Sequence, residues 1–552
     1  MRKNQNPITD ENRRKFIKTS AVGGITAAAL STLDFAKSVA SPFFNFNRVQ
    51  PAELDEITID ELKNGYRSGK YTIKSVTEQY ISRIKEIDKQ GPLLNSVIEL
   101  NPDALKIAAE LDSELKEKGA RGPLHGIPVL IKDNIDTADG MLTTAGSLAL
   151  VGSKPVQDSF LVQRLRAAGA LILGKTNLSE WANYRSTHST SGWSGRGGLT
   201  KNPYALDRNT SGSSAGSGAA AAANLCAIAI GTETDGSVVS PSAINGIVGI
   251  KPTVGLVSRS GIIPISHSQD TAGPMARTVR DAAILLGVMQ GSDPEDGATT
   301  GKDRKAFSDY EQFLDGNGLS GARIGVLRKY FGILPQVDAI IDNAIGVLKK
   351  KGAVLVDPVI IDSVGKLDSN ESTVLSYEIK ADMKAYLERR GPGSVMHSLK
   401  DLIDFNTKHA SEEMPYFGQE LFLQAEERGP LSDAAYLEAL ETNHRMTREE
   451  GIDAIMEKHH LDAIVCPTDG PAWVTDLVDG DHALGLSSQL PAVAGYPHIT
   501  VPAGFLFGLP IGISFFGKAW SEPMLLKIAY GFEQATKVRT PPRFLPAAQM
   551  NL

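Results

Sequence analysis

The sequence predicts an α/β domain in which helices cover both faces of a central sheet. Short apolar runs rich in β-branched residues alternate with helical segments along most of the chain, and such strands are typical of sheets buried on both sides. No linker rich in Pro or Ser and no internal repeat interrupts residues 41–552. We therefore expect one large domain, with the charged, predominantly helical residues 370–460 as an insertion within it.

The individual elements follow from hydrophobic periodicity and from the residues that flank it. Residues 73–87 carry apolar side chains near the spacing of a helix, and Pro102 is typical of the start of another helix over 104–118. The run GIPVLI (126–131) is apolar and contains β-branched residues, which predicts a buried strand. The later elements expected are a helix at 162–168, a strand at 170–173, a Gly/Ser-rich loop at 192–217, a helix at 219–226, strands at 227–231, 324–327, 354–356 and 462–465, and a helix at 524–536.

Residues 1–40 have the three ordered parts of an export signal. Arg13 and Arg14 lie in a twin-arginine pattern, an apolar stretch covers 21–33, and SVA at 38–40 offers small residues to a signal peptidase. The alternative is a basic arm followed by a buried helix. We expect a twin-arginine signal peptide, and hence an exported protein that is periplasmic or secreted.

Charge and composition narrow the classes of partner. The chain has 552 residues and a formal net charge of −7, and residues 1–40 hold seven basic and three acidic residues, so the remainder carries −11. A chain of this charge is not expected to bind nucleic acid or anionic lipid, and no run of 18 apolar residues predicts a membrane span. The two cysteines, Cys226 and Cys466, are too few for a disulfide framework or a cysteine-ligated metal site, and their pairing stays open.

Three polar residues stand where strands end or loops begin. Lys132 directly follows the strand 126–131, Ser237 follows the strand 227–231 after a short turn, and Ser213 lies in the Gly/Ser-rich loop. Ligands of open α/β sheets bind outside the carboxyl ends of the strands. A lysine buried there can lose its charge and serve as a general base for a serine nucleophile. A solvated lysine beside ordinary turns is the alternative interpretation.

Other catalytic motifs are weak. Gly212 to Gly216 satisfies G-x-S-x-G, which would make Ser214 a nucleophile, but the preceding residues 201–210 are polar and do not form the strand that this motif requires. The sequence has no H-E-x-x-H motif, no ligand-spaced histidine cluster and no phosphate-binding lysine after a Gly-rich loop. We expect neither a metal nor a cofactor.

Six ordered stretches carry a resemblance to a known family. They are LHGIPVLIKDNIDT (124–137), GKTNLSEWAN (174–183), SGSSAGSGAAAAA (211–223), GTETDGSVVSPSAINGIVGIKPTVGLVSRSGIIP (231–264), SQDTAGPMARTVRDAA (268–283) and AGYPHITVPAG (494–504). Over residues 55–540 the chain resembles the amidase signature family. The resemblance implies a single large α/β domain with a mixed central sheet, covered by helices on both faces.

The resemblance also implies roles for individual residues. The family's catalytic lysine, bridging serine and nucleophile fall on Lys132, Ser213 and Ser237, with a cis peptide bond joining Ser213 to Ser214 or to its predecessor. Ser237 would form an acyl-enzyme that water hydrolyses. The implied oxyanion and substrate-binding residues are Thr234, Asp235, Gly236, Ser237 and Ser214.

Two departures from the family pattern bear on the substrate. Asp235 replaces the first glycine of a common Gly-Gly pair, and Val239 and Ser240 stand where many relatives carry an arginine. TETDGS, SGWSGRGG (191–198) and EMPYFGQELF (413–422) are similar to the bacterial peptide amidases, which implies hydrolysis of C-terminal peptide amides.

Three alternative functions stay open: an amidase acting on other aliphatic or aryl amides, the catalytic subunit of a tRNA-dependent amidotransferase, and a non-catalytic binding protein. We expect a small-molecule or peptide amide as substrate. We also expect a monomer without stable membrane association.

Overall fold

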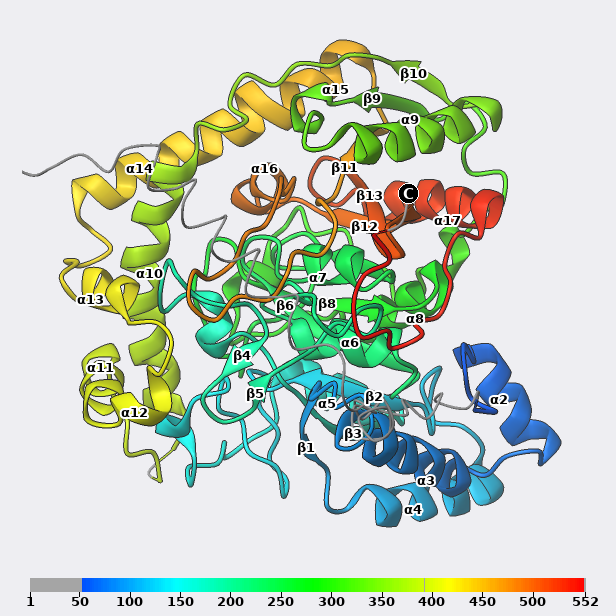
Figure 1. Cartoon of the computed structure of the whole chain (residues 1–552), viewed down its shortest axis with the longest axis vertical. Helices are drawn as coiled ribbons and strands as arrows, with labels where there is room; N and C mark the ends of the chain where they lie inside the picture. The colour runs from blue at the N-terminus through cyan, green and yellow to red at the C-terminus, as the bar shows by residue number, and fades with distance from the viewer. Residues whose placement is uncertain (1–51, 392, 551–552) are drawn as a thin grey trace, which may run out of the picture. The chain divides into compact units, whose positions relative to one another are not determined.

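The computed structural model describes residues 52–391 and 393–550 (Figure 1). The expected signal peptide at 1–40 lies outside these residues. Val49–Leu552 forms one compact unit. Among the described residues, none of the helices combines the length and the apolar character needed to cross a membrane.

An eleven-stranded sheet forms the centre of this unit. Its strands are β1 (Val97–Leu100), β2 (Pro128–Lys132), β3 (Leu171–Thr176), β6 (Ile228–Glu233), β7 (Val248–Lys251), β8 (Thr271–Ala276), β9 (Arg323–Val326), β10 (Val354–Val356), β11 (Ala463–Pro467), β12 (His498–Leu506) and β13 (Leu509–Phe516). They lie in the order β1-β3-β2-β6-β8-β7-β12-β13-β11-β9-β10. β2 is parallel to both β3 and β6, whereas β8 is antiparallel to β6, so the sheet is mixed as expected.

The helices lie around this sheet. They are α2 (Ile59–Ser68), α3 (Ile73–Arg83), α4 (Ala104–Lys118), α5 (Phe160–Ala167), α6 (Ala215–Ala222), α7 (Val239–Ile244), α8 (Val279–Met289), α9 (Pro335–Lys350), α10 (Asp368–Arg389), α11 (Leu399–Lys408), α12 (Ala410–Glu413), α13 (Glu420–Glu426), α14 (Ala434–His444), α15 (Asp453–His459), α16 (Gln489–Val493) and α17 (Glu522–Thr536). α6 and α7 contact each other and the middle strands, while α5, α8, α17 and α9 contact one another in series as a second layer. Helices therefore cover both faces of the sheet, and the predicted fold class is confirmed.

The structure corrects several predicted elements. Five strands of the eleven-stranded sheet were missed: β1, β7, β8, β12 and β13. The helix expected at 219–226 begins earlier and ends at Ala222, because the chain must turn there to enter β6. The loop expected at 192–217 contains a two-stranded hairpin, β4 (Trp193–Ser194) and β5 (Gly198–Leu199), and the first turn of α6.

The helical segment 370–460 supports the loop that leads to the site. α10 to α13 lie together on one flank of the sheet (Figure 1). Leu178 and Trp181 are buried in one apolar cluster with residues of α10, α11 and α13, and the Trp181 and Phe422 rings meet edge to face at 5.8 Å. A buried ion pair of 3.0 Å between Arg185 and Glu180 lies beside this cluster. Both cysteines are buried and free.

Candidate active site

Lys132 is the last residue of β2 and is completely buried. Its Nζ donates hydrogen bonds to Ser213 Oγ (2.7 Å), Thr232 Oγ1 (2.9 Å) and the Thr232 carbonyl oxygen (3.1 Å). Burial lowers the pKa of Lys132 to about 7, although the charges of Asp270 and Glu233 oppose this shift. A substantial fraction of the amine is therefore neutral near pH 7 and can accept a proton from Ser213.

Ser213 lies in the tight loop that leads into α6. It is 1% exposed, and the Gly212–Ser213 peptide bond is cis, which is one of the two positions expected. The loop approaches its neighbours closely, because a Cβ added at Gly212 would lie 2.2 Å from Ser179 Oγ. A glycine is therefore required before Ser213.

Ser237 lies in the turn between β6 and α7, with its side chain free to react. It is 8% exposed, and its hydroxyl makes no hydrogen bond with any described residue. Its carbonyl oxygen accepts a hydrogen bond of 3.2 Å from the N–H of Ser214, which joins the two serine loops. The structure places Ser213 and Ser237 on one cavity but does not hydrogen-bond them to each other.

The turn before Ser237 presents backbone donors. The N–H groups of Thr234, Asp235 and Ser237 donate to no acceptor among the described residues, whereas that of Gly236 is directed at Glu233. Gly236 has φ +79°, a conformation that favours glycine. Backbone N–H groups without a partner, at the turn that carries the expected nucleophile, can stabilise an oxyanion.

Ser214 has a different role from the other predicted residues. Its hydroxyl donates to the Thr232 carbonyl oxygen (3.0 Å) and accepts from the Thr232 N–H (3.2 Å), and it is completely buried. It does not belong to the described lining of the cavity. These two hydrogen bonds fix the loop to β6.

The two serines open into a cavity of about 240 Å³. Its lining includes apolar side chains (Ile265, Leu375, Trp473 and Leu486) and three carboxylates (Asp235, Asp469 and Asp481). Sequence reasoning missed Asp469 and Asp481, which come from the chain after β11. The only sequence signal for Asp469 is its place just beyond an apolar strand, the same signal that identified Lys132.

A second cavity of about 240 Å³ lies behind the lysine. Its lining includes Thr232, the hydrogen-bond partner of Lys132, and Asn134, whose amide donates to Thr232 Oγ1 at 2.9 Å. Ala182, Thr234 and Ile265 line both cavities and form the wall between them.

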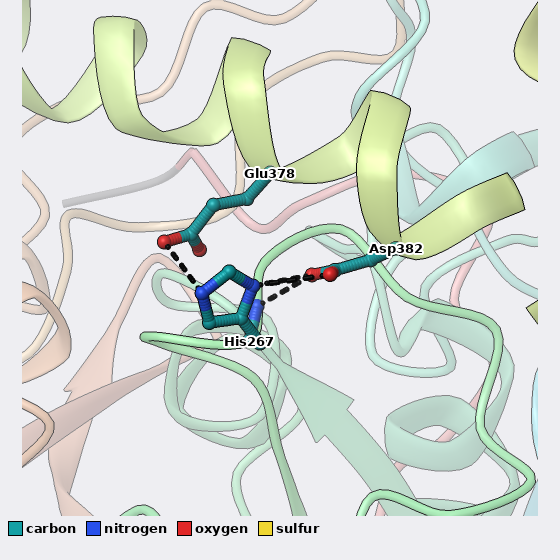
Figure 2. A group of neighbouring side chains, drawn as sticks. All are labelled: His267, Glu378 and Asp382. Atoms are coloured by element: carbon teal, nitrogen blue, oxygen red, sulfur yellow. Dashed lines mark hydrogen bonds and ion pairs between the residues drawn. The ribbon is translucent and has the colours of Figure 1, made fainter. Parts of the chain in front are cut away.

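His267, on the rim of the second cavity, lies between two carboxylates of α10 (Figure 2). Its Nδ1 is 2.9 Å from Asp382 Oδ2, and its Nε2 is 3.3 Å from Glu378 Oε1. Although burial opposes the shift, the hydrogen bond that the His267 ring donates to Asp382 and the charges of both carboxylates raise the pKa of His267. The three ligand atoms lie within 4.8 Å of one another, but each ring nitrogen already has its own carboxylate. This geometry fits a protonated imidazole better than a metal ligand.

The mixed eleven-stranded sheet, the buried lysine that is hydrogen-bonded to a cavity serine and the family match over most of the chain together identify an enzyme of the amidohydrolase class. The chain belongs to the Amidase family, whose model matches residues 75–526. The family resemblance seen in the sequence is thereby confirmed.

Individual relatives cover nearly the whole chain. A probable amidase of Arabidopsis thaliana is 43% identical, over 89% of this chain and 92% of that protein. The crystal structure of a peptide amidase from Stenotrophomonas maltophilia is 50% identical with a TM-score of 0.85, covering 90% of this chain and 100% of that one. The amidase family protein of Bacillus anthracis, also a crystal structure, is 37% identical with a TM-score of 0.80, covering 89% of this chain and 93% of that one.

Proposed function

We propose that the protein hydrolyses the C-terminal amides of peptides, releasing ammonia, with Lys132, Ser213 and Ser237 as its catalytic residues. The observation that carries this proposal is the 2.7 Å hydrogen bond from the buried Lys132 amine to Ser213, beside the unpartnered hydroxyl of Ser237. The similarity to a peptide amidase at 50% identity supports the substrate class.

In the proposed mechanism, neutral Lys132 takes a proton from Ser213 while Ser213 takes one from Ser237. The Ser237 oxygen then attacks the amide carbon, and the N–H groups of Thr234, Asp235 and Ser237 bind the oxyanion. The relay returns a proton to the amide nitrogen, the C–N bond breaks and ammonia leaves. Water attacks the remaining ester by the same relay, and this step releases the carboxylic acid and restores the Ser237 hydroxyl.

The test is ammonia release by the purified protein from amidated peptides, with their free-acid forms, benzamide and acetamide for comparison. Turnover of amidated peptides with little ammonia from benzamide or acetamide is the expected result. Turnover of benzamide or acetamide alone would favour the second candidate, an amidase of other aliphatic or aryl amides. No ammonia from any amide would contradict both.

Replacement of the nucleophile tests the mechanism itself. We expect Ser237→Ala to lower kcat/KM by a factor of about 10⁴ or more, because no acyl-enzyme can form. Any burst of product from acyl-enzyme formation should also be absent in this variant. Near-normal turnover by this variant would place the chemistry at another residue, and Thr187→Ala, an exposed change outside the cavity, is the control.

We further propose that the chain is exported by the twin-arginine route and acts as a monomer. The twin-arginine pattern and the apolar stretch that follows it support export. Periplasmic activity should disappear in Arg13→Lys/Arg14→Lys, whereas unchanged export of that variant would reject the route. Light scattering of the purified protein tests the oligomeric state.

A further inference from the structure

The serine cavity is lined by three acidic side chains and, among the described residues, by no basic one. Asp235, Asp469 and Asp481 line it, and no described residue of its lining is Lys, Arg or His. Beyond the lining, Glu371 lies against Asp235 and adds a fourth carboxyl group. Two basic groups outside the lining weakly oppose the rise in the pKa of these acids. They are Lys251, which is completely buried, and His482, which follows Asp481 in the chain.

Each of the three carboxyl groups accepts a hydrogen bond from a serine. Asp469 Oδ2 accepts a hydrogen bond of 2.5 Å from Ser240, which follows Ser237 by three residues in the first turn of α7. Asp481 accepts hydrogen bonds from the N–H (2.9 Å) and hydroxyl (2.5 Å) of Ser191.

Asp235 lies two residues before Ser237 and accepts a hydrogen bond from Ser488. The partners that orient the three carboxylates of the lining are thus neutral donors. Hydrogen bonds from neutral groups orient a carboxylate but leave its charge uncompensated.

Because no cation of the described lining compensates these carboxyl groups, burial favours their protonated forms, and Asp469 is partly protonated near pH 7. Burial raises the pKa of Asp469 to about 7, raises that of Asp481, and raises that of Asp235 well above its ordinary value, with Glu371 and Glu233 adding to the last shift. A cation that enters the cavity would stabilise the ionised carboxylates, whereas a substrate carboxylate would be repelled.

The apolar part of the cavity complements these charges. Trp473 donates from Nε1 to Asp481 Oδ1 at 3.3 Å, so an aromatic surface lies directly beside a carboxylate. Leu375 and Leu486 line the same cavity. An alkyl chain that ends in a cation can pack on such a surface and pair with the carboxylate.

We propose, on the basis of the proposed amidase function, that this cavity selects amides whose acyl part carries a positive charge, either an α-ammonium group or a basic side chain, and disfavours acyl parts that carry a carboxylate. The absence of an arginine at Val239 and Ser240 agrees with this preference, because an arginine there would compensate the acids and attract a carboxylate.

The experiment compares kcat/KM for four dipeptide amides: Ala-Lys-NH₂ with Ala-norleucine-NH₂, and Ala-Glu-NH₂ with the isosteric Ala-Gln-NH₂. Each is measured with a free and with an acetylated amino terminus. We expect the lysine amide to exceed the glutamate amide by about tenfold or more, with the neutral pair between them. A loss of activity on acetylation identifies the α-ammonium as the recognised group, whereas a preference for lysine that persists after acetylation identifies the side chain.

Variants locate the charge that is responsible. Asp469→Asn and Asp481→Asn should each reduce the lysine-to-glutamate ratio several-fold while the glutamine amide is still hydrolysed. Asp479→Asn, an exposed residue of the same loop that does not line the cavity, should leave the ratio unchanged. Two variants at different positions guard against the failure of one of them to fold.

The outcomes separate the two proposals. No turnover of any of the four amides contradicts the proposed function. Turnover of the glutamine amide with a lysine-to-glutamate ratio near one, or below one, overturns the charge preference and leaves the amidase function intact. A ratio that the two variants do not change also overturns it, because these carboxylates would then not cause the preference.

Discussion

Two neighbouring strands of the sheet, β2 and β3, each carry a completely buried lysine near the carboxyl end. Lys132 is the last residue of β2 and Lys175 is the second-last of β3, and the strands are paired so that Ile131 lies opposite Lys175. Burial lowers the pKa of both lysines. Only one of them contacts a serine that lines the cavity.

The surroundings explain the difference. Lys175 donates to the Ile135 carbonyl oxygen (2.6 Å) and Thr143 Oγ1 (2.8 Å), and four carboxylates favour its charged form: Asp133, Asp136, Asp139 and Glu99. Lys132 has neutral partners only, and two acidic groups act on it. Under the proposed mechanism, burial alone does not make a general base, since the lysine also needs a proton donor that reaches the substrate.

The largest expected effect tests this comparison directly. Lys132→Met should lower kcat by a factor of about 10² to 10⁴, because the proposed relay loses its base. Lys175→Met should leave the activity of the folded protein within about threefold of normal. Steady-state ammonia release, normalised to the folded fraction from circular dichroism, measures both. Equal losses in the two variants would show that both lysines act only through the fold.

A pH profile sharpens the comparison. The neutral amine is the active form of a base, so kcat/KM should fall below pH 7, by about tenfold for each pH unit once Lys132 is protonated. Lys175→Met should keep this acidic limb at the same pH. The residual activity of Lys132→Met should show no acidic limb. If the limb persists in this variant, it belongs to another group, such as Asp270, whose pKa burial raises to about 6.

Stability should show the opposite ranking. Lys175→Met removes two hydrogen bonds from a charged donor and leaves the surrounding carboxylates without that charge, so the free energy of unfolding should fall by about 2–4 kcal/mol. Urea unfolding of both variants measures the difference. Lys132→Met should be destabilised less, because only two acidic groups act on the charge of Lys132, whereas four carboxylates favour that of Lys175.

The same contrast explains what could be predicted from the sequence. Lys132 and Ser237 each come shortly after an apolar run that is visible in the local sequence. The sequence alone therefore predicts that Lys132 lies at the end of a strand and that Ser237 follows a strand after a short turn. Periodicity could not distinguish Lys132 from Lys175, because the difference comes from residues distant in sequence. Ser213 lies 81 positions from Lys132 along the chain.

The missed strands have a physical reason as well. β8 lies between β6 and β7 in the interior of the sheet, yet it contains Pro274 paired with Ile230. Proline lacks the N–H of a ladder hydrogen bond and normally argues against a central strand. In β12, Pro502 and the shift in register beside it likewise interrupt the alternation of side chains that predicts a strand.

The smallest expected effect concerns the threonine that each lysine contacts. Thr232 Oγ1 accepts from Lys132 at 2.9 Å and Thr143 Oγ1 accepts from Lys175 at 2.8 Å. Thr232→Val removes an acceptor that favours the charged amine, so the pKa of Lys132 should decrease and the acidic limb of kcat/KM should move to lower pH, by less than about one unit. Thr143→Val should not move the limb, although it loses a comparable hydrogen bond. A shift of the same size and sign in both variants would mean that the limb reports the stability of the fold, and the distinction between the two lysines would then fail.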